Sequence, residues 1–317
     1  MLLTLVFILA GFLILGVGAE LMVNGSSRLA LRLGISPLMV GLTVVAFGTS
    51  APELAVSIES TLSGLSAIAL GNVVGSNIAN IGLILGVTAL IHPIRIERDL
   101  IRHQIPVVIA CSVLMGLLLL DGEIGRLDGV ILCTGLLVYL VRSFSEARSA
   151  VAPEELELPP IVAPRSAGGL PLNFVLVVLG LALLVFGSQI FVNNAVELAR
   201  FLGISEAVIG LSLVAVGTSI PELATSATAA LRKQSDLAVG NVVGSNIFNI
   251  LCVLGITALL GSISGSQFEG LDFAIMLAFA LLLLPFAGSG LVLSRLEGTL
   301  LLAAYCGYVA FISLRAV

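Results

Sequence analysis

The stretch GLTVVAFGTSAPELAVS at Gly41–Ser57 decides the fold, because the chain repeats it at Gly210–Ser226 as GLSLVAVGTSIPELATS. A second stretch, GNVVGSNIANIGLILG at Gly71–Gly86, returns as GNVVGSNIFNILCVLG at Gly240–Gly255. Both pairs keep the same offset of 169 residues, from 41 to 210 and from 71 to 240. About 30 of the 50 positions aligned from Gly41 onward are identical, which indicates duplication of an ancestral half.

The composition places this duplicated chain in a membrane. Of its 317 residues, 58% are hydrophobic and only 10% are charged, whereas an average soluble domain carries about 25% charged residues. The apolar runs are roughly 17–25 residues long, which suits membrane-spanning helices rather than the short alternating strands of a barrel. We therefore expect an all-α polytopic membrane protein.

Polar, glycine and proline breaks divide the chain into ten expected spans, five in each copy. They lie near residues 2–24, 36–61, 67–91, 104–121, 125–143, 172–195, 205–230, 236–260, 270–287 and 291–314. The segment 144–171 is rich in proline and acidic residues, and we expect it to be a linker between a first repeat (residues 1–143) and a second repeat (residues 172–317).

An odd number of spans in each copy turns the second copy upside down relative to the first. With the N-terminus outside, eleven of the fourteen basic residues fall on the cytoplasmic side, as the positive-inside rule requires. The sequence thus predicts ten transmembrane helices arranged as two inverted five-helix repeats. We expect them in the plasma membrane, with a cytoplasmic linker and both termini outside.

Each copy carries a Pro-Glu pair near the middle of a span, Pro52-Glu53 and Pro221-Glu222. A charged side chain at that depth costs about 2.5–3.5 kcal/mol on insertion scales, so it marks an ion or proton pathway by default. Proline has no N–H and clashes with the carbonyl four residues back, so each helix is expected to break just before its glutamate. Pairing of the glutamates with intramembrane basic residues is the alternative, but every Lys and Arg falls at a span end.

Oxygen atoms of several kinds gather at each break. The candidate ligands are carbonyls, hydroxyls and one carboxylate per half: Ala46, Thr49, Ser50 and Glu53, with Ala215, Thr218, Ser219 and Glu222. An all-oxygen set suits hard cations such as Na⁺ and Ca²⁺.

The span that follows each break carries a polar stripe. Its members are Asn72, Ser76 and Asn80, with Asn77 adjacent, and the second copy repeats them as Asn241, Ser245, Asn249 and Asn246. Asparagine inside a span can simply hold helices together. Because these stripes are duplicated beside the Pro-Glu pairs, they predict a second wall of the same site. The glycine pairs Gly71/Gly75 and Gly240/Gly244 predict close helix approach.

These motifs make the chain similar to a known family. GTSAPE with GNVVGSNIAN, and GTSIPE with GNVVGSNIFN, resemble the two alpha-repeats of the calcium/cation antiporter superfamily, the sodium/calcium exchangers, and especially their prokaryotic members. The resemblance rests on four motifs in the same order and at the same spacing. It implies two inverted halves around a core of broken spans, with the first and sixth spans forming a gate that slides during alternating access.

The resemblance also implies a role for each candidate residue. Glu53 and Glu222 would be the central carboxylates for calcium and sodium. Hydroxyl and carbonyl ligands would come from Thr49, Thr218, Ser50, Ser219, Ala46 and Ala215. Ser76 and Ser245 would complete sodium sites, and Asn80 and Asn249 would face the glutamates. Some relatives have Asp at one of these two asparagine positions, and potassium-dependent relatives resemble that type, so we expect no potassium dependence here.

The expected function is therefore secondary active antiport of Na⁺ against Ca²⁺, with several Na⁺ entering as Ca²⁺ leaves. Two alternatives stay open: an H⁺/Ca²⁺ or other cation exchanger of the same family, in which the two glutamates would titrate, and a cation channel with two symmetric half-pores. No nucleophile–base pair or cofactor motif suggests an enzyme. We expect no cofactor, Na⁺ and Ca²⁺ as transported ions, a lipid bilayer as surroundings, no nucleic acid and no obligatory protein partner.

Overall fold

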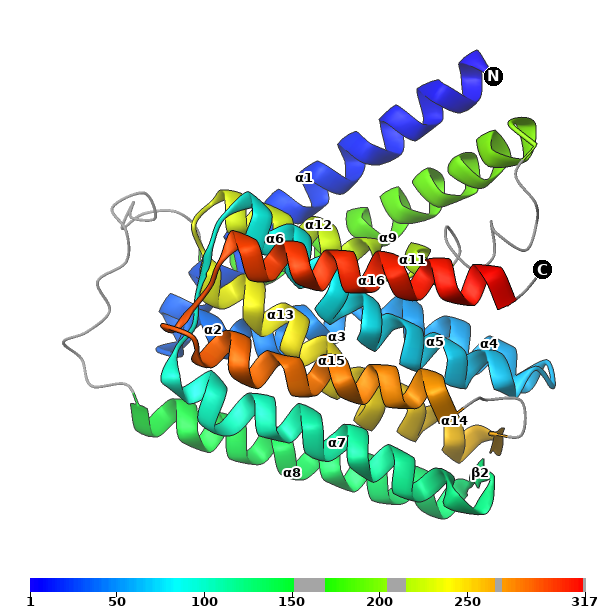
Figure 1. Cartoon of the computed structure of the whole chain (residues 1–317). Helices are drawn as coiled ribbons and strands as arrows, with labels where there is room; N and C mark the ends of the chain where they lie inside the picture. The colour runs from blue at the N-terminus through cyan, green and yellow to red at the C-terminus, as the bar shows by residue number, and fades with distance from the viewer. Residues whose placement is uncertain (151–168, 204–214, 266–269, 316–317) are drawn as a thin grey trace.

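The computed structural model describes residues 1–150, 169–203, 215–265 and 270–315, and these residues are mostly helical (Figure 1). Among them, nine helices are long and apolar enough to cross a membrane. They are Leu2–Leu33, Pro37–Leu62, Ser66–Ile91, Leu100–Asp121, Arg126–Ser145, Leu170–Phe201, Ser235–Leu260, Gly270–Gly288 and Arg295–Arg315. The expected span 205–230 begins in residues outside those described. Its described part is helical from Ala215 onward, apart from a short break at Thr218 and Ser219.

The helical spans are built from shorter elements. In the first half these are α1 (Leu2–Leu33), α2 (Pro37–Val40), η1 (Gly41–Val45), α3 (Ala46–Thr49), α4 (Ala51–Leu62), α5 (Ser66–Ala79), η2 (Asn80–Leu85), α6 (Gly86–Ile91), η3 (Leu100–Gln104), α7 (Ile105–Leu118), η4 (Leu119–Asp121) and α8 (Arg126–Ala150). In the second half they are α9 (Leu170–Phe201), α11 (Ala215–Gly217), α12 (Ile220–Leu231), α13 (Ser235–Phe248), η6 (Asn249–Leu254), α14 (Gly255–Leu260), α15 (Gly270–Gly288) and α16 (Arg295–Arg315).

The first and sixth spans are longer than the sequence predicted, each being a single helix of 32 residues. The expected end of α1 near residue 24 was wrong, because the polar residues there do not stop the helix. Ser27 Oγ donates to the carbonyl of Val23 at 2.9 Å, which satisfies the hydroxyl inside the helix itself. The helix ends instead at Gly34, whose φ of 65° is a left-handed cap that glycine adopts without strain.

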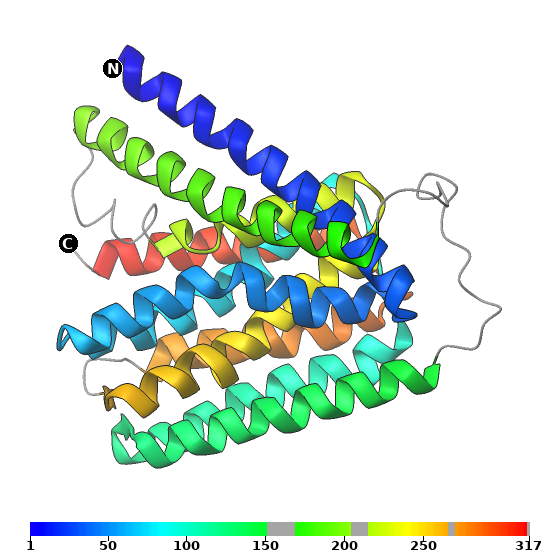
Figure 2. The ribbon, with the colours of Figure 1, turned by 180° about the vertical axis from the view of Figure 1, so that it is seen from behind.

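Helices α1 and α9 lie side by side in opposite directions (Figure 2). Their contact is a seam of glycines spaced seven residues apart. A Cβ on Gly11 would lie 3.1 Å from the carbonyl of Gly187, and one on Gly18 would lie 2.9 Å from that of Gly180. The two backbones therefore touch directly, as small residues permit between membrane helices.

Two short strand pairs join the halves. Strand β1 (Ile94–Arg95) pairs with β4 (Val292–Leu293), and β2 (Glu123–Ile124) pairs with β3 (Ile263–Ser264), both antiparallel. The offset of 169 residues converts β1 into β3 and β2 into β4. The same contact is thus made twice, with the halves exchanged.

Helix α13 lies at the centre of the bundle, and every residue from Leu237 to Phe248 is buried. The close approach predicted for Gly240 and Gly244 is confirmed. A Cβ on Gly240 would lie 2.7 Å from the carbonyl of Leu38, and one on Gly244 would lie 2.6 Å from that of Leu42. The second repeat's glycine pair therefore packs on the first repeat. The same prediction for Gly71 and Gly75 was wrong, because a Cβ on either residue would meet no atom of the described residues within 4 Å.

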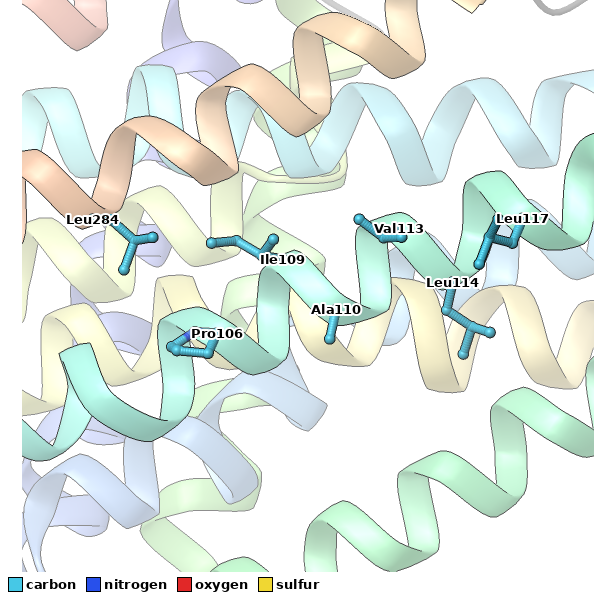
Figure 3. A pocket seen from close by; sticks show the side chains of 7 residues that line it. All are labelled: Pro106, Ile109, Ala110, Val113, Leu114, Leu117 and Leu284. Atoms are coloured by element: carbon cyan, nitrogen blue, oxygen red, sulfur yellow. The ribbon is translucent and has the colours of Figure 1, made fainter.

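The periphery of the bundle is apolar. Figure 3 shows a groove along α7 lined by Ile109, Val113 and Leu117, with Leu284 of α15 beside Ile109. No charged side chain lines this groove among the residues described. Large apolar side chains are also exposed on α8 and α16, for example Leu137 (63%) and Leu296 (70%). An apolar surface of this extent is the kind that lipid tails cover.

The glycine seam yields a first prediction. Gly18→Ala should destabilise the protein by about 1–3 kcal/mol, because its methyl group would overlap the backbone of α9. Gly16→Ala is the matched control, since a Cβ there meets no atom of the described residues within 4 Å. Thermal unfolding followed by circular dichroism in detergent measures both. Equal melting temperatures for the two variants would contradict the seam.

A second prediction concerns Glu97, in the loop between α6 and η3, outside the spans. Partial burial, with the charges of Asp236 and Asp99, raises the pKa of its carboxyl above the ordinary value. The protonated form is thus favoured in the folded state, and this stabilisation is lost as the pH rises. Glu97→Gln should therefore melt higher than the unaltered chain at pH 7, with the difference disappearing near pH 4. A difference that is the same at both pH values would contradict this.

Candidate ion-binding site

Both proline-containing spans break where the prolines predicted. Helix α3 ends at Thr49 and α4 begins at Ala51, with Ser50 between them at φ −80° and ψ 4°. Pro52 stands in the first turn of α4, where its missing N–H has no partner to lose. The second half repeats this geometry, with Ser219 at φ −88° and ψ 6° before α12. Each break therefore sets a helix N-terminus in mid-span.

Glu53 and Glu222 lie in the first turns of α4 and α12, and neither side chain has any exposed surface. Ser219 Oγ donates to Glu53 Oε1 at 3.1 Å, and Ser50 Oγ donates to Glu222 Oε1 at 3.4 Å. Ser76 Oγ is 3.5 Å from the same Oε1 of Glu53. The two carboxylates also lie close enough to repel each other. Each half thus supplies a hydroxyl to the other half's glutamate.

These serine–glutamate hydrogen bonds between the halves differ from the helix capping that the local sequence favours. Ser50 and Glu53, in SAPE, have the spacing of a capping box, in which the serine and glutamate side chains bond the N–H groups of their own helix. SIPE at Ser219–Glu222 has the same spacing. Neither serine side chain caps its own helix here. The serine hydroxyls donate across the interface instead.

The side chains of Asn72 and Asn241 form hydrogen bonds with residues at the two helix breaks. Asn72 Nδ2 donates to the Glu53 carbonyl at 3.1 Å and to Ser57 Oγ at 3.0 Å. Its Oδ1 accepts the Thr218 hydroxyl at 3.4 Å. Asn241 makes the equivalent contacts: its Nδ2 donates to the Glu222 carbonyl and to Ser226 Oγ, and its Oδ1 accepts the Thr49 hydroxyl at 3.1 Å.

Sequence reasoning placed Asn72 and Asn241 in the polar stripes but not among the site residues, and it passed over Ser57 and Ser226. The duplicated Asn–Ser spacing of 15 residues was the available signal.

Two further asparagine pairs cross the centre of the molecule. Asn80 Nδ2 donates to Asn246 Oδ1 at 3.3 Å, and Asn249 Nδ2 donates to Asn77 Oδ1 at 3.1 Å. All four side chains are at most 2% exposed. Asn80 and Asn249 each begin a π-helical segment, η2 and η6, a distortion often found at functional sites. Asn77 and Asn246 were not among the candidate ligands and emerge as their partners.

Several buried oxygen atoms of the site have no hydrogen-bond partner among the described residues. Glu53 Oε2, Glu222 Oε2, Asn80 Oδ1 and Asn249 Oδ1 are buried and accept no hydrogen bond from any described residue. Ser245 Oγ is also buried without such a partner. Leaving buried acceptors unsatisfied is costly. Cations bound beside these atoms would satisfy them.

The remaining candidates lie along the same breaks. The Ala46 carbonyl accepts the Ser50 N–H at 3.0 Å and the Thr49 hydroxyl at 3.4 Å. Ala215 is the first residue of α11. Within the four described segments, no group of three or more His, Cys, Asp or Glu residues is placed to hold a metal ion. A cation here would thus meet two carboxylates and otherwise neutral oxygens.

Comparison with known proteins agrees with this geometry. The family model described as sodium/calcium exchanger protein matches residues 3–145 and, separately, residues 172–314. The putative antiporter CaxA of Alkalimonas amylolytica is 39% identical, over 97% of this chain and 98% of its own. The sodium/calcium exchanger MaX1 of Methanosarcina acetivorans is 32% identical, over 95% and 96%.

A solved structure is similar over the same extent. The sodium-calcium exchanger NCX_Mj, soaked without Na⁺ and Ca²⁺, superposes with a TM-score of 0.84 at 32% identity, covering 98% of this chain and 99% of that one. The matches to whole relatives, and the separate matches of the family model to the two halves of this chain, are consistent with the duplicated motifs. The chain belongs to the sodium/calcium exchanger protein family.

Proposed function

We propose that this protein exchanges Na⁺ for Ca²⁺ across the membrane by alternating access, with both ions competing for one site between the halves. The observation that carries the proposal is the set of buried, unpartnered oxygens on Glu53, Glu222, Asn80 and Asn249. Oxygen ligands of this kind suit Ca²⁺, which takes six to eight of them at about 2.3–2.6 Å. Thr49, Thr218, Ser50, Ser219, Ser76, Ser245 and the carbonyls of Ala46 and Ala215 would complete the ion sites.

Charge balance supplies the coupling. Two carboxylates neutralise one Ca²⁺, whereas an empty site would expose two negative charges to the low-dielectric interior. Movement of the empty core would therefore be slow, and an ion bound on one side would have to be replaced before the return. Since the asparagines add no negative charge, a load of several Na⁺ would leave net positive charge, which makes the exchange electrogenic.

The same proposal includes the inverted arrangement. Residues 1–143 would form one five-helix repeat and residues 172–317 the other, joined by a linker at 144–171 that lies mostly outside the described residues. The exchanged strand pairs and the opposed directions of α1 and α9 support it. Helix α8 runs on to Ala150, seven residues beyond the expected end of the first repeat. The excess of basic residues supports a cytoplasmic linker with both termini outside, and the proposal includes the plasma membrane as the location.

The site bears on the two alternatives. An H⁺/Ca²⁺ exchanger would use the same glutamates as proton carriers and the same unpartnered oxygens as Ca²⁺ ligands, so the site itself fits either coupling ion. A cation channel would need a continuous path, and the buried cross-contacts between the halves leave the glutamates without exposed surface. The relatives named as sodium/calcium exchangers favour sodium coupling.

The direct test is Ca²⁺ uptake into proteoliposomes preloaded with Na⁺. Uptake should require the outward Na⁺ gradient, and Glu53→Gln and Glu222→Gln should each reduce it to the level of protein-free liposomes. Glu59→Gln is the matched control, because this exposed carboxylate stands on the same helix as Glu53 but outside the site. It should keep the unaltered rate.

Replacing the Na⁺ gradient by a pH gradient separates the rivals. Uptake driven equally well by protons would overturn sodium coupling. Flux of Ca²⁺ without any counter-ion would instead establish a channel.

The asparagine pairs yield a further prediction. Asn77→Ala should raise the KM for Ca²⁺ by about three- to tenfold, the loss of one hydrogen bond, because the Asn249 amide would no longer be held with its oxygen toward the ion. Asn246→Ala should do the same through Asn80. Asn194→Ala, whose side chain bonds the Ile190 carbonyl of its own helix, is the control. An unchanged KM in both variants would remove the orienting role.

A further inference from the structure

Helices α1 and α9 do not sit symmetrically between the two halves. Both pack against α12, whereas in the described part of the chain neither makes comparable contact with α4, the equivalent helix of the first half. The accessible surface reflects this difference. Ala51 and Ala55 of α4 are exposed, while their counterparts in α12, Ile220 and Ala224, are partly buried. Among the described residues, α1 and α9 therefore cover the α12 side of the core but not the α4 side.

On the α12 side, α1 is bound to the turn between α12 and α13 by polar contacts. The guanidinium of Arg232 faces the carboxylate of Glu20 with two nitrogens, Nε lying 3.2 Å from Oε2 and Nη2 contacting Oε1. One helical turn on, Asn24 Nδ2 donates to Glu20 Oε1 at 2.8 Å and fixes the carboxylate. About two turns beyond Glu20, Ser27 Oγ lies 2.6 Å from Gln234 Oε1 and shares its proton between this oxygen and the Val23 carbonyl.

The turn itself is rigid, and this holds its side chains in place. Gln234 N–H donates to the Ala229 carbonyl and Lys233 N–H to that of Ala230, closing the end of α12. Lys233 adopts φ 58°, a left-handed conformation that costs a side-chain-bearing residue about 1–2 kcal/mol. The equivalent turn of the first half gives this position to Gly64, with φ 77°. The two turns therefore share one backbone shape, and only their side chains differ.

The α4 side lacks these polar groups. The offset of 169 residues converts Glu20 and Arg232 into Gln189 and Ser63, which cannot form an ion pair. It converts Ser27 and Gln234 into Val196 and Leu65, whose side chains cannot form a hydrogen bond. The two halves thus differ in these polar groups where the first and sixth spans would close on the core.

We propose that Glu20 and Arg232, supported by Ser27 and Gln234, form a one-sided latch that holds α1 and α9 on the α12 half and biases the exchanger toward the state open along α4. The inference rests on the proposed alternating-access exchange. In the proposed orientation the latch lies on the cytoplasmic side, so the favoured state faces outward. Glu20 and Arg232 are positioning residues, because they touch the gate and not the ions.

The solvent exposure of the Glu20 and Arg232 side chains limits how strongly their ion pair can favour one state. The Arg232 and Glu20 side chains are 51% and 35% exposed, and pairs of this kind contribute modestly in water. The latch therefore shifts a population a few-fold and does not lock the protein. Such a bias suits a transporter that must leave this state in every cycle, because a deeper minimum would slow the return.

The test measures the two states directly. Ala55→Cys and Ala224→Cys occupy equivalent positions on α4 and α12, and each is introduced alone as a reporter. The protein is held in lipid nanodiscs, so that both faces meet a water-soluble maleimide, and modification is quantified by peptide mass spectrometry at the reporter site. Without other changes, the cysteine at 55 should react faster than the one at 224. Glu20→Gln should lower the first rate and raise the second, so that their ratio falls by about threefold.

Two further variants separate the latch from general damage. Exchange of the charges, Glu20→Arg with Arg232→Glu, should restore the original ratio of rates. Transfer of the pair to the α4 side, Gln189→Glu with Ser63→Arg, should protect the cysteine at 55 when combined with Glu20→Gln. Labelling rates that do not change in Glu20→Gln would overturn the proposal. So would a charge exchange that does not restore the original ratio of the two rates.

The labelling runs without ion gradients, so its failure and that of the proposed function are distinguishable. Loss of the rate shifts in a protein that performs sodium-driven Ca²⁺ uptake would overturn the latch alone. Rate shifts of the expected sign in a protein without such uptake would support the latch and overturn the proposed exchange.

Discussion

Two carboxylates without exposed surface, each accepting a hydroxyl from the opposite half of a membrane protein, are the constraint on which the rest of the structure depends. Burial of Glu53 and Glu222 is unfavourable in a low-dielectric interior. The prolines offset part of this cost by breaking the helices, so that each glutamate lies at the positive N-terminal end of a helix. Hydroxyls from the opposite half supply donors to one oxygen of each carboxylate and leave the second oxygen to a cation.

The cross-half contacts carry this arrangement through the whole core. Serines that would otherwise cap their own helices donate to the other half, and the asparagines of one stripe orient those of the other. Because a carboxamide has a donor end as well as an acceptor end, its orientation decides whether it attracts or repels a cation. Binding the Nδ2 atoms of Asn80 and Asn249 elsewhere turns both amides into acceptors. Neutral asparagine side chains can in this way act as cation ligands.

The fold and the centre of the site could be read from the sequence because their signals are local. Proline within an apolar run indicates a break, a mid-span glutamate indicates function, and paired glycines indicate close packing. The orienting roles of Asn77 and Asn246 could not be read in this way, since their partners are 172 and 166 residues distant. The length of α1 was missed because a polar residue at Ser27 looks like an end, although its hydroxyl is satisfied within the helix and by Gln234. The role of Glu20 has no local signal either, because its partner Arg232 is 212 residues distant.

The exchanged contacts also bear on how such a protein is made. A ribosome delivers the first half before the second, and at that moment Glu53 has no Ser219, Asn80 has no Asn246 and Gly41 has no Gly240 to pack against. The newly inserted first half must wait in the bilayer with buried polar groups unmet, exposed to quality-control proteases. Its maturation is therefore completed by synthesis of the second half, and either half expressed by itself should be short-lived until the other is supplied.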